Sequence, residues 1–275
     1  MVFVKTSYCF RSLPVSSLVA GLLMGCIACQ FKGQMKYDSW QTYRGSPDAL
    51  QYSSLSQIDT TNVHLLKPVW TFHTGDSGQR TTIECNPIII GNKIYLTSPA
   101  LQLFALESST GKELWRFRPA GKAGINRGVT YWKHHDQESI FFSADKYMYK
   151  LDAHTGKLIE SFGHGGKIDL REGLGKDTSA LSITLSTPGI MYEDNLIIGS
   201  ATGEGYNASP GHIRAYDAMT GQMRWIFHTI PQKGEYGYDT WAWVDGENYG
   251  GSNNWGGMSL DEKKGIVYVS TGSPT

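Results

Sequence analysis

An internal repeat constrains the fold of this chain more than any other feature. Three segments, 105–115, 150–158 and 215–225, share an apolar stretch, an acidic residue and a Thr-Gly pair, and the first and third end in tryptophan. The Thr-Gly pairs lie 45 and then 65 residues apart, and a weaker copy covers 260–269. Self-similarity at such a period is typical of architectures in which neighbouring units complete one another's hydrophobic core.

Each copy is predicted to form a β-hairpin. In the first copy a strand over 103–106 precedes the acidic residue, the Thr-Gly pair closes the turn, and a second strand carries Trp115. An acidic side chain accepts hydrogen bonds from the turn backbone, and glycine adopts the positive φ that the turn needs. Another strand pair lies upstream, with Gly91-Asn92 between two apolar runs, which is a hairpin signal.

Four strands in about 45 residues match the length of a propeller blade. We therefore expect an all-β fold, a β-propeller of four-stranded blades, with about four blades over 40–275. The longer spacing before the third copy predicts an insertion around 163–178. The repeated tryptophans are interpreted as packing between blades rather than as a ligand cage.

The N-terminal residues are predicted to direct export. A basic start precedes an apolar stretch over 13–28, which is too short and too interrupted for a membrane span and is typical of a secretory signal. We expect a signal peptide over 1–25 and a linker over 26–39, and therefore a periplasmic or otherwise exported protein. The Leu-Met-Gly-Cys motif at 23–26 resembles a lipoprotein signal, so either Cys26 carries a lipid anchor or the leader is simply cleaved.

Charge and cysteine content limit the classes of partner and scaffold. The formal net charge of the 275 residues is +0, so electrostatics give no reason to expect nucleic acid as a partner. Cys9, Cys26 and Cys29 lie in or beside the predicted leader, and Cys85 has no evident partner. This distribution argues against a disulfide framework. The C-x-x-C spacing is not followed by histidine, which excludes a haem attachment site.

Several motifs resemble the opening of quinoprotein alcohol and glucose dehydrogenases, which depend on pyrroloquinoline quinone (PQQ). They are Trp-Gln-Thr-Tyr-Arg-Gly at 40–45, Gln-Tyr-Ser-Ser-Leu at 51–55 and Val-Trp-Thr-Phe-His-Thr-Gly at 69–75. The repeated Thr-Gly segment with its tryptophan is similar to the tryptophan-docking motif of that family. The resemblance runs over 40–275 and implies that this chain is the N-terminal portion of such an enzyme, with about four blades of an expected eight.

The resemblance implies a cofactor site that includes three residues. Glu84 matches a glutamate near a PQQ carboxylate, Arg127 an arginine at the acidic edge of the cofactor, and Trp255 the tryptophan beneath the quinone. A guanidinium fork suits a carboxylate, and an aromatic ring suits a flat quinone. Each residue taken singly also has an ordinary interpretation, as a solvated strand end, a surface ion pair or propeller packing.

The resemblance also implies a Ca²⁺ ion. Glu204 matches a glutamate ligand, and Ser273 follows Thr-Gly where the family commonly has an asparagine ligand, although a hydroxyl is a weaker one. The catalytic aspartate of the family lies further along than Thr275. No catalytic residue is therefore predicted within the chain, and the chain alone is expected to be inactive.

The implied activity is oxidation of a sugar or alcohol hydroxyl, with electrons passed to cytochrome c or a membrane quinone. Alcohol-oxidising members carry two adjacent cysteines before the Asn-Arg-Gly motif, whereas 121–125 is Gly-Lys-Ala-Gly-Ile here. This difference favours the glucose-type branch over the methanol-type branch. The alternative is a non-enzymatic propeller scaffold, a lipoprotein of the outer-membrane assembly type. That alternative explains the repeats and Cys26 but not the site motifs.

Overall fold

The computed structural model describes residues 37–79, 81–121, 124–243 and 249–275. The predicted leader, Cys26 and most of the predicted linker lie outside the described residues. No helix in the described ranges is long and apolar enough to cross a membrane. Helical structure there is confined to the short 3-10 turns η1 (Val63–Leu65), η2 (Thr178–Ala180) and η3 (Tyr238–Thr240).

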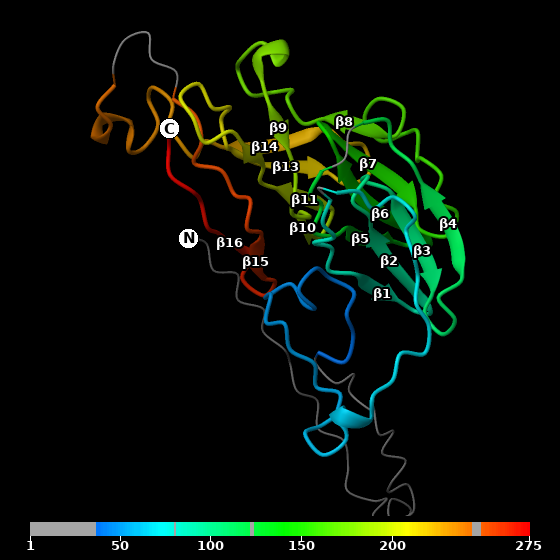
Figure 1. The fold of residues 1–275 in the computed structure, drawn as a ribbon. Coiled ribbons are helices and arrows are strands. Elements are labelled where there is room, and N and C mark those ends of the chain that lie inside the picture. Colours follow the sequence, from blue (N-terminus) through cyan, green and yellow to red (C-terminus); the bar gives the residue numbers. More distant parts are fainter. Residues whose placement is uncertain (1–36, 80, 122–123, 244–248) are drawn as a thin grey trace, which may run out of the picture. The chain divides into compact units, whose positions relative to one another are not determined.

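Three four-stranded antiparallel sheets, here called blades 1, 2 and 3, dominate the described chain (Figure 1). Blade 1 consists of β1 (Ile88–Ile90), β2 (Lys93–Thr97), β3 (Leu103–Glu107) and β4 (Glu113–Phe117). Blade 2 consists of β5 (Thr130–His134), β6 (Gln137–Ala144), β7 (Tyr147–Asp152) and β8 (Lys167–Asp169). Blade 3 consists of β10 (Ile190–Tyr192), β11 (Asn195–Ile198), β13 (Ile213–Asp217) and β14 (Met223–Phe227). The predicted all-β, four-stranded blade is confirmed.

The remaining strands form two pairs. β15 (Met258–Asp261) pairs with β16 (Ile266–Val269), and β9 (Ile183–Thr184) pairs with β12 (Ala201–Thr202). The prediction of about four blades therefore corresponds to three complete sheets and the first hairpin of another. The predicted insertion is partly wrong, because β8 lies inside it and pairs with β7. The additional length is spread over the segments before β8, between β8 and β10 and between β11 and β13, and the last two segments contribute β9 and β12.

The repeated turns have the predicted local chemistry. Asp152 Oδ1 accepts a hydrogen bond from the backbone N–H of Thr155 over 2.8 Å, and Asp217 Oδ1 accepts one from Thr220 over 2.7 Å. Gly156 then adopts a φ of +69°, which an L side chain rarely tolerates. Because these bonds close within a few residues, the sequence pattern alone predicts them.

Two tryptophans donate hydrogen bonds to the repeated turn of the next blade along the chain. Trp70 Nε1 donates to the carbonyl oxygen of Ser108 over 3.0 Å, and Trp115 Nε1 donates to that of Ala153 over 3.2 Å. A Cβ added to Gly156 would lie 2.5 Å from Cε3 of Trp115, so the bare glycine allows the ring to lie against the turn. This geometry agrees with the interpretation of these tryptophans as packing between blades.

Apolar cores lie between consecutive sheets. Blades 1 and 2 share a core that includes Leu103, Ile140 and Phe142. Blades 2 and 3 share one with Phe141 and Tyr216, and a smaller core joins blade 3 to the β15–β16 hairpin. Consecutive sheets thus bury apolar side chains against one another, as in a propeller. The segments that connect the blades follow β4, β8 and β14. These segments lie outside the sheets and are available to form a site.

Candidate cofactor site

The predicted cofactor residues lie on segments outside the strands of the blades. Glu84 precedes β1, Arg127 lies between β4 and β5, and Trp255 lies between β14 and β15. Arg127 and Trp255 line a cavity of about 590 Å³, together with Glu204 from the segment between β11 and β13. Residues that are far apart in the sequence therefore meet at one cavity, and the order of the blades brings them there.

The Arg127 guanidinium is held from two sides. Its Nη2 atom lies 2.8 Å from Oε2 of Glu84, and its Nη1 atom donates to Oγ of Ser186 over 3.0 Å. Its Cζ atom lies 5.7 Å from the centroid of the Trp255 ring. A guanidinium has five N–H donors, so donors remain for a further acidic group. Glu84 does not line the cavity itself; it reaches the site through Arg127.

The Asn-Arg-Gly sequence explains how Arg127 is placed. Asn126 Nδ2 donates to the carbonyl oxygen of Ser143 over 2.9 Å, and Asn126 Oδ1 accepts from the N–H of Gly128 over 2.9 Å. A Cβ on Gly128 would lie 3.0 Å from the carbonyl oxygen of Asn86, so glycine permits this close approach. The buried asparagine therefore fixes the turn, and the arginine between the two residues points to the cavity.

The Glu84 segment is anchored to blade 1 by its neighbours. The N–H of Thr97 donates to Sγ of Cys85 over 3.2 Å, and the N–H of Asn86 donates to the carbonyl oxygen of Arg127 over 2.9 Å. Burial raises the pKa of the Cys85 thiol, which stays protonated at neutral pH. Cys85 is thus a packing residue that helps to place Glu84 beside Arg127.

Trp255 combines a fixed backbone with an accessible ring. Its carbonyl oxygen accepts from Oγ1 of Thr187 over 2.5 Å, and Asn254 Nδ2 donates to the carbonyl oxygens of Gly257 and Ser270 over 2.8 and 2.7 Å. The residue is nevertheless 51% exposed. An exposed ring on a tightly bonded backbone provides a rigid stacking surface for a flat ligand.

The two predicted metal ligands differ in their placement. Glu204 is exposed and lines the cavity. Ser273 is exposed and does not line it; its carbonyl oxygen accepts from the N–H of Ser252 over 3.0 Å. Within the described ranges no group of three or more His, Cys, Asp or Glu residues is arranged to hold a metal ion. The structure therefore brings Glu204 to the site, while the role of Ser273 stays a prediction.

Two residues at the cavity, Ser186 and Asn253, were not predicted from the sequence. Ser186 contacts Arg127, and Asn253 lines the cavity beside Trp255. Asn253 Nδ2 donates to the carbonyl oxygen of Ser200 over 3.0 Å, which leaves the amide oxygen available. A signal for Asn253 was present in the Asn-Asn pair before Trp255. Ser186 has no such signal, because it lies 59 residues from Arg127 in the sequence.

The residues at this cavity fit PQQ and a hard cation. Arg127 offers donors to a carboxylate, Trp255 offers a ring face, and Ser186 is buried beside them. The carboxylate of Glu204 and the amide oxygen of Asn253 are the oxygen ligands that Ca²⁺ prefers. The donor set thus matches an acidic, flat, metal-associated ligand.

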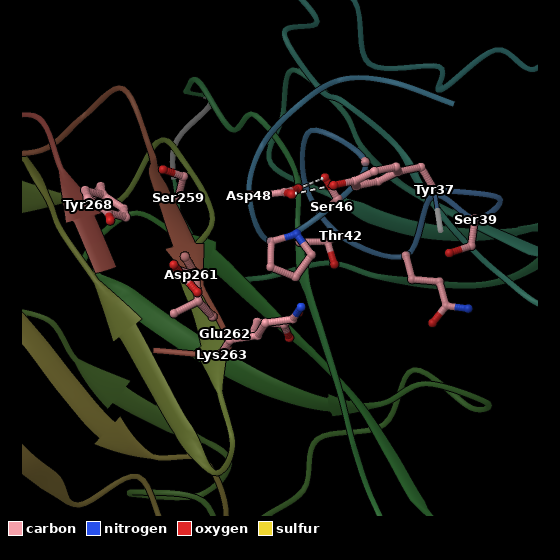
Figure 2. Close-up of a pocket in the computed structure, with 14 residues that line it drawn as sticks. Tyr37, Ser39, Thr42, Ser46, Asp48, Ser259, Asp261, Glu262, Lys263 and Tyr268 are labelled. Carbon is pink, nitrogen blue, oxygen red and sulfur yellow. Dashed lines mark hydrogen bonds between the residues drawn. The ribbon is translucent and has the colours of Figure 1, made fainter. Parts of the chain in front are cut away.

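A second and larger cavity lies apart from these residues (Figure 2). It measures about 710 Å³ and lies between the 37–48 segment and the β15–β16 hairpin. Asp48 accepts there from the hydroxyls of Tyr37 and Ser46, over 2.7 and 2.5 Å. None of the predicted site residues lines this cavity. It is therefore not the candidate cofactor site.

The blades and the site together define a propeller protein with a candidate cofactor pocket between its blade connections. The chain belongs to the PQQ family described as the glucose/ethanol/alcohol dehydrogenase β-propeller domain, which matches residues 40–275. The predicted resemblance to quinoprotein dehydrogenases is confirmed by this match.

Characterised relatives agree with this assignment. The chain is 31% identical over 276 residues to quinoprotein glucose dehydrogenase A of Acinetobacter calcoaceticus, covering 86% of this chain and 33% of that protein. It is 27% identical over 278 residues to quinate/shikimate dehydrogenase (quinone) of Acinetobacter baylyi, with the same two coverages, 86% and 33%. The chain thus spans about a third of the length of these relatives.

A solved structure shows the same fold. Quinohemoprotein alcohol dehydrogenase from Comamonas testosteroni superposes with a TM-score of 0.70 at 24% sequence identity. The superposition covers 86% of this chain and 36% of that protein. The β-propeller architecture predicted from the repeats is therefore confirmed at the level of the fold.

Proposed function

We propose that this chain forms part of the PQQ-binding site of a dehydrogenase that oxidises a hydroxyl group of a sugar or an alcohol. One observation carries the proposal: Arg127, held by Glu84 and Ser186, lies beside the half-exposed ring of Trp255 at a cavity. Membership of the PQQ family and the names of the relatives support the reaction class.

Each residue has a separate task at the proposed site. Arg127 donates to the carboxylates of PQQ, and the ring of Trp255 stacks on its flat face. Glu204, with the amide oxygen of Asn253, binds Ca²⁺, and Ser273 is retained as a weaker candidate ligand. Bound between these residues, PQQ would supply hydride-accepting chemistry, and a Ca²⁺ ion held by Glu204 would supply Lewis-acid chemistry. We assign no general base to this chain.

Glu84 acts on the cofactor indirectly in this proposal. A carboxylate placed directly against a carboxylate of PQQ would be repelled. With Oε2 at 2.8 Å from Nη2 of Arg127, Glu84 instead orients the guanidinium plane, and the cofactor carboxylate takes the remaining donors. The glutamate and the cofactor carboxylate thus share one arginine.

The cellular location, the electron acceptor and the type of substrate are also proposed. The predicted leader indicates export to the periplasm, with or without a lipid at Cys26. We propose cytochrome c or a membrane quinone as the electron acceptor, since relatives are named methanol dehydrogenase [cytochrome c] subunit 1 and quinate/shikimate dehydrogenase (quinone). The stretch 121–125 lacks cysteine, which favours a sugar over methanol as substrate.

Titration with PQQ tests this function directly. We expect PQQ to quench tryptophan fluorescence saturably in the protein that contains this chain, with Ca²⁺ tightening the complex. Replacing Trp255 with phenylalanine should remove part of the quenching, while Trp40→Phe serves as a control outside the cavity lining. Absence of saturable binding, with and without Ca²⁺, would refute the proposed function. A dye-reduction assay with sugars and alcohols then identifies the substrate class.

A further inference from the structure

Two consecutive residues contact the arginine and the tryptophan of the candidate cofactor site. Ser186 and Thr187 lie in the connection between β9 and β10 and are 9% and 3% exposed. Ser186 accepts twice from Arg127, through Oγ from Nη1 over 3.0 Å and through its carbonyl oxygen from the backbone N–H over 2.7 Å. The serine therefore restrains both the main chain and the side-chain tip of the arginine.

Thr187 restrains the main chain of the stacking residue. Its Oγ1 atom donates to the carbonyl oxygen of Trp255 over 2.5 Å. A Cβ on Gly257 would lie 3.0 Å from Cγ2 of Thr187, so the methyl group packs closely against the same loop. Arg44 supports this loop from another segment, because its Nη2 atom donates to the carbonyl oxygen of Gly256 over 3.0 Å.

We propose that Ser186 and Thr187 are positioning residues that set the Arg127 guanidinium and the Trp255 ring at a fixed separation for the cofactor. This inference rests on the proposed function. Neighbouring residues of one short segment hold the guanidinium from the β4–β5 connection and the main chain that carries the ring in the β14–β15 connection. A displacement of this segment therefore changes the spacing between the carboxylate clamp and the stacking surface together.

The physical basis is preorganisation. A ligand that binds through a carboxylate and a ring face requires both partners in register, and flexible partners lower its affinity. Arg127 and Trp255 come from connections between different blades, so the sheets alone leave their separation loosely defined. The dipeptide supplies hydrogen bonds to both segments from largely buried positions, where such bonds are strengthened.

The decisive variants remove one hydroxyl at a time. Thr187→Val deletes the bond to Trp255, Thr187→Ser keeps it, and Ser186→Ala deletes the side-chain bond to Arg127. Thr130→Val is the matched control, because the buried Oγ1 of Thr130 donates to the carbonyl oxygen of Gly189 over 2.8 Å in the same connection. Thr130→Val loses an equivalent hydrogen bond, and Thr130 forms no hydrogen bond with Arg127 or Trp255.

We expect Thr187→Val and Ser186→Ala to raise the Kd for PQQ about tenfold, which corresponds to about 1.4 kcal/mol. Thr187→Ser should stay close to the parent, and Thr130→Val should change the Kd less than twofold. Thermal unfolding of all four variants reports the purely structural cost. Equal effects of Thr187→Val and Thr130→Val on the Kd would overturn the positioning role.

A second readout separates this inference from the proposed function. Acrylamide quenching of the Trp255 fluorescence, isolated by subtracting the signal of Trp255→Phe, reports the mobility and exposure of the ring without any cofactor. Thr187→Val should increase this quenching, whereas Thr130→Val should not. If the parent fails to bind PQQ, the proposed function fails, and the quenching experiment still decides whether Thr187 positions Trp255. Unchanged quenching in Thr187→Val would overturn the inference.

Discussion

The indole nitrogen of Trp115 donates to the carbonyl oxygen of Ala153 over 3.2 Å, and this bond joins the last strand of blade 1 to the turn of blade 2. Trp225 occupies the same register in blade 3, paired with Ala215 as Trp115 is paired with Ala105. The two tryptophans therefore occupy equivalent positions of the repeat.

The docked ring of Trp115 predicts a large effect on stability. Trp115→Ala should lower the free energy of unfolding by about 3 kcal/mol, because it removes a packed ring and leaves an acceptor unpaired. Leu114→Ala, at a half-exposed position of the same strand, should cost less than half as much. Urea unfolding of the two variants measures both values, and equal losses would contradict the docking interpretation.

Arg127→Lys is expected to weaken PQQ binding by about tenfold. An ammonium group cannot reproduce the guanidinium fork that contacts Glu84, Ser186 and the ligand at once. Arg224→Lys is the control, because Arg224 forms its ion pair with Asp217 on the surface of blade 3. Fluorescence titration measures both affinities. A parental affinity in Arg127→Lys would remove this residue from the proposed site.

Glu204→Gln is expected to lower the affinity for Ca²⁺ by at least tenfold and to reduce the tightening of PQQ binding by Ca²⁺. The change keeps the size of the side chain but removes the charge and one strong oxygen ligand. Glu160→Gln provides an exposed carboxylate outside the cavity lining as the control. Calorimetric titration with CaCl₂ in the presence of PQQ tests this, and an unchanged calcium affinity would reject Glu204 as a ligand.

Lys150 is a buried cation in the core between blades 2 and 3. Its Nζ atom lies 4.4 Å from the centroid of Trp132 and 5.8 and 6.0 Å from those of Phe141 and Phe162, without a hydrogen-bond partner in the described chain. Burial lowers its pKa from 10.5 to about 8, although nearby carboxylates act in the opposite direction. The aromatic box only partly replaces the lost hydration.

Lys150→Met is therefore expected to stabilise the protein, by up to about 3 kcal/mol at pH 7. Between pH 8 and 10.5 the unfolded parent binds more protons than the folded parent, so parental stability rises with pH in this window. The advantage of Lys150→Met should shrink accordingly as the pH is raised. Lys157→Met, at an exposed position, is the control. A gap that stays constant from pH 7 to pH 10 would contradict the buried-cation assignment.

Local chemistry explains what could be predicted for the fold. The turns at Asp152 and Asp217 and the strands that flank them depend on hydrogen bonds within a few residues, which the motif specifies directly. Blade 2 departs from the repeat because Leu158 forms only an isolated bridge to Leu151, and β8 follows nine residues later at Lys167. No local signal distinguishes that strand from the glycine-rich loop around it.

The sequence by itself determined the blade repeat, its turns and, through motif resemblance, the identities of Arg127, Trp255 and Glu204 as candidates for one site. Only the tertiary structure decided that Glu84 forms an ion pair with Arg127 and that Ser186 and Thr187 form hydrogen bonds with Arg127 and Trp255. It also decided that aromatic rings surround Lys150. The physical reason is the distance along the sequence over which each kind of contact forms. Turn bonds and strand alternation are encoded in adjacent residues, whereas contacts between blade connections depend on how whole sheets pack.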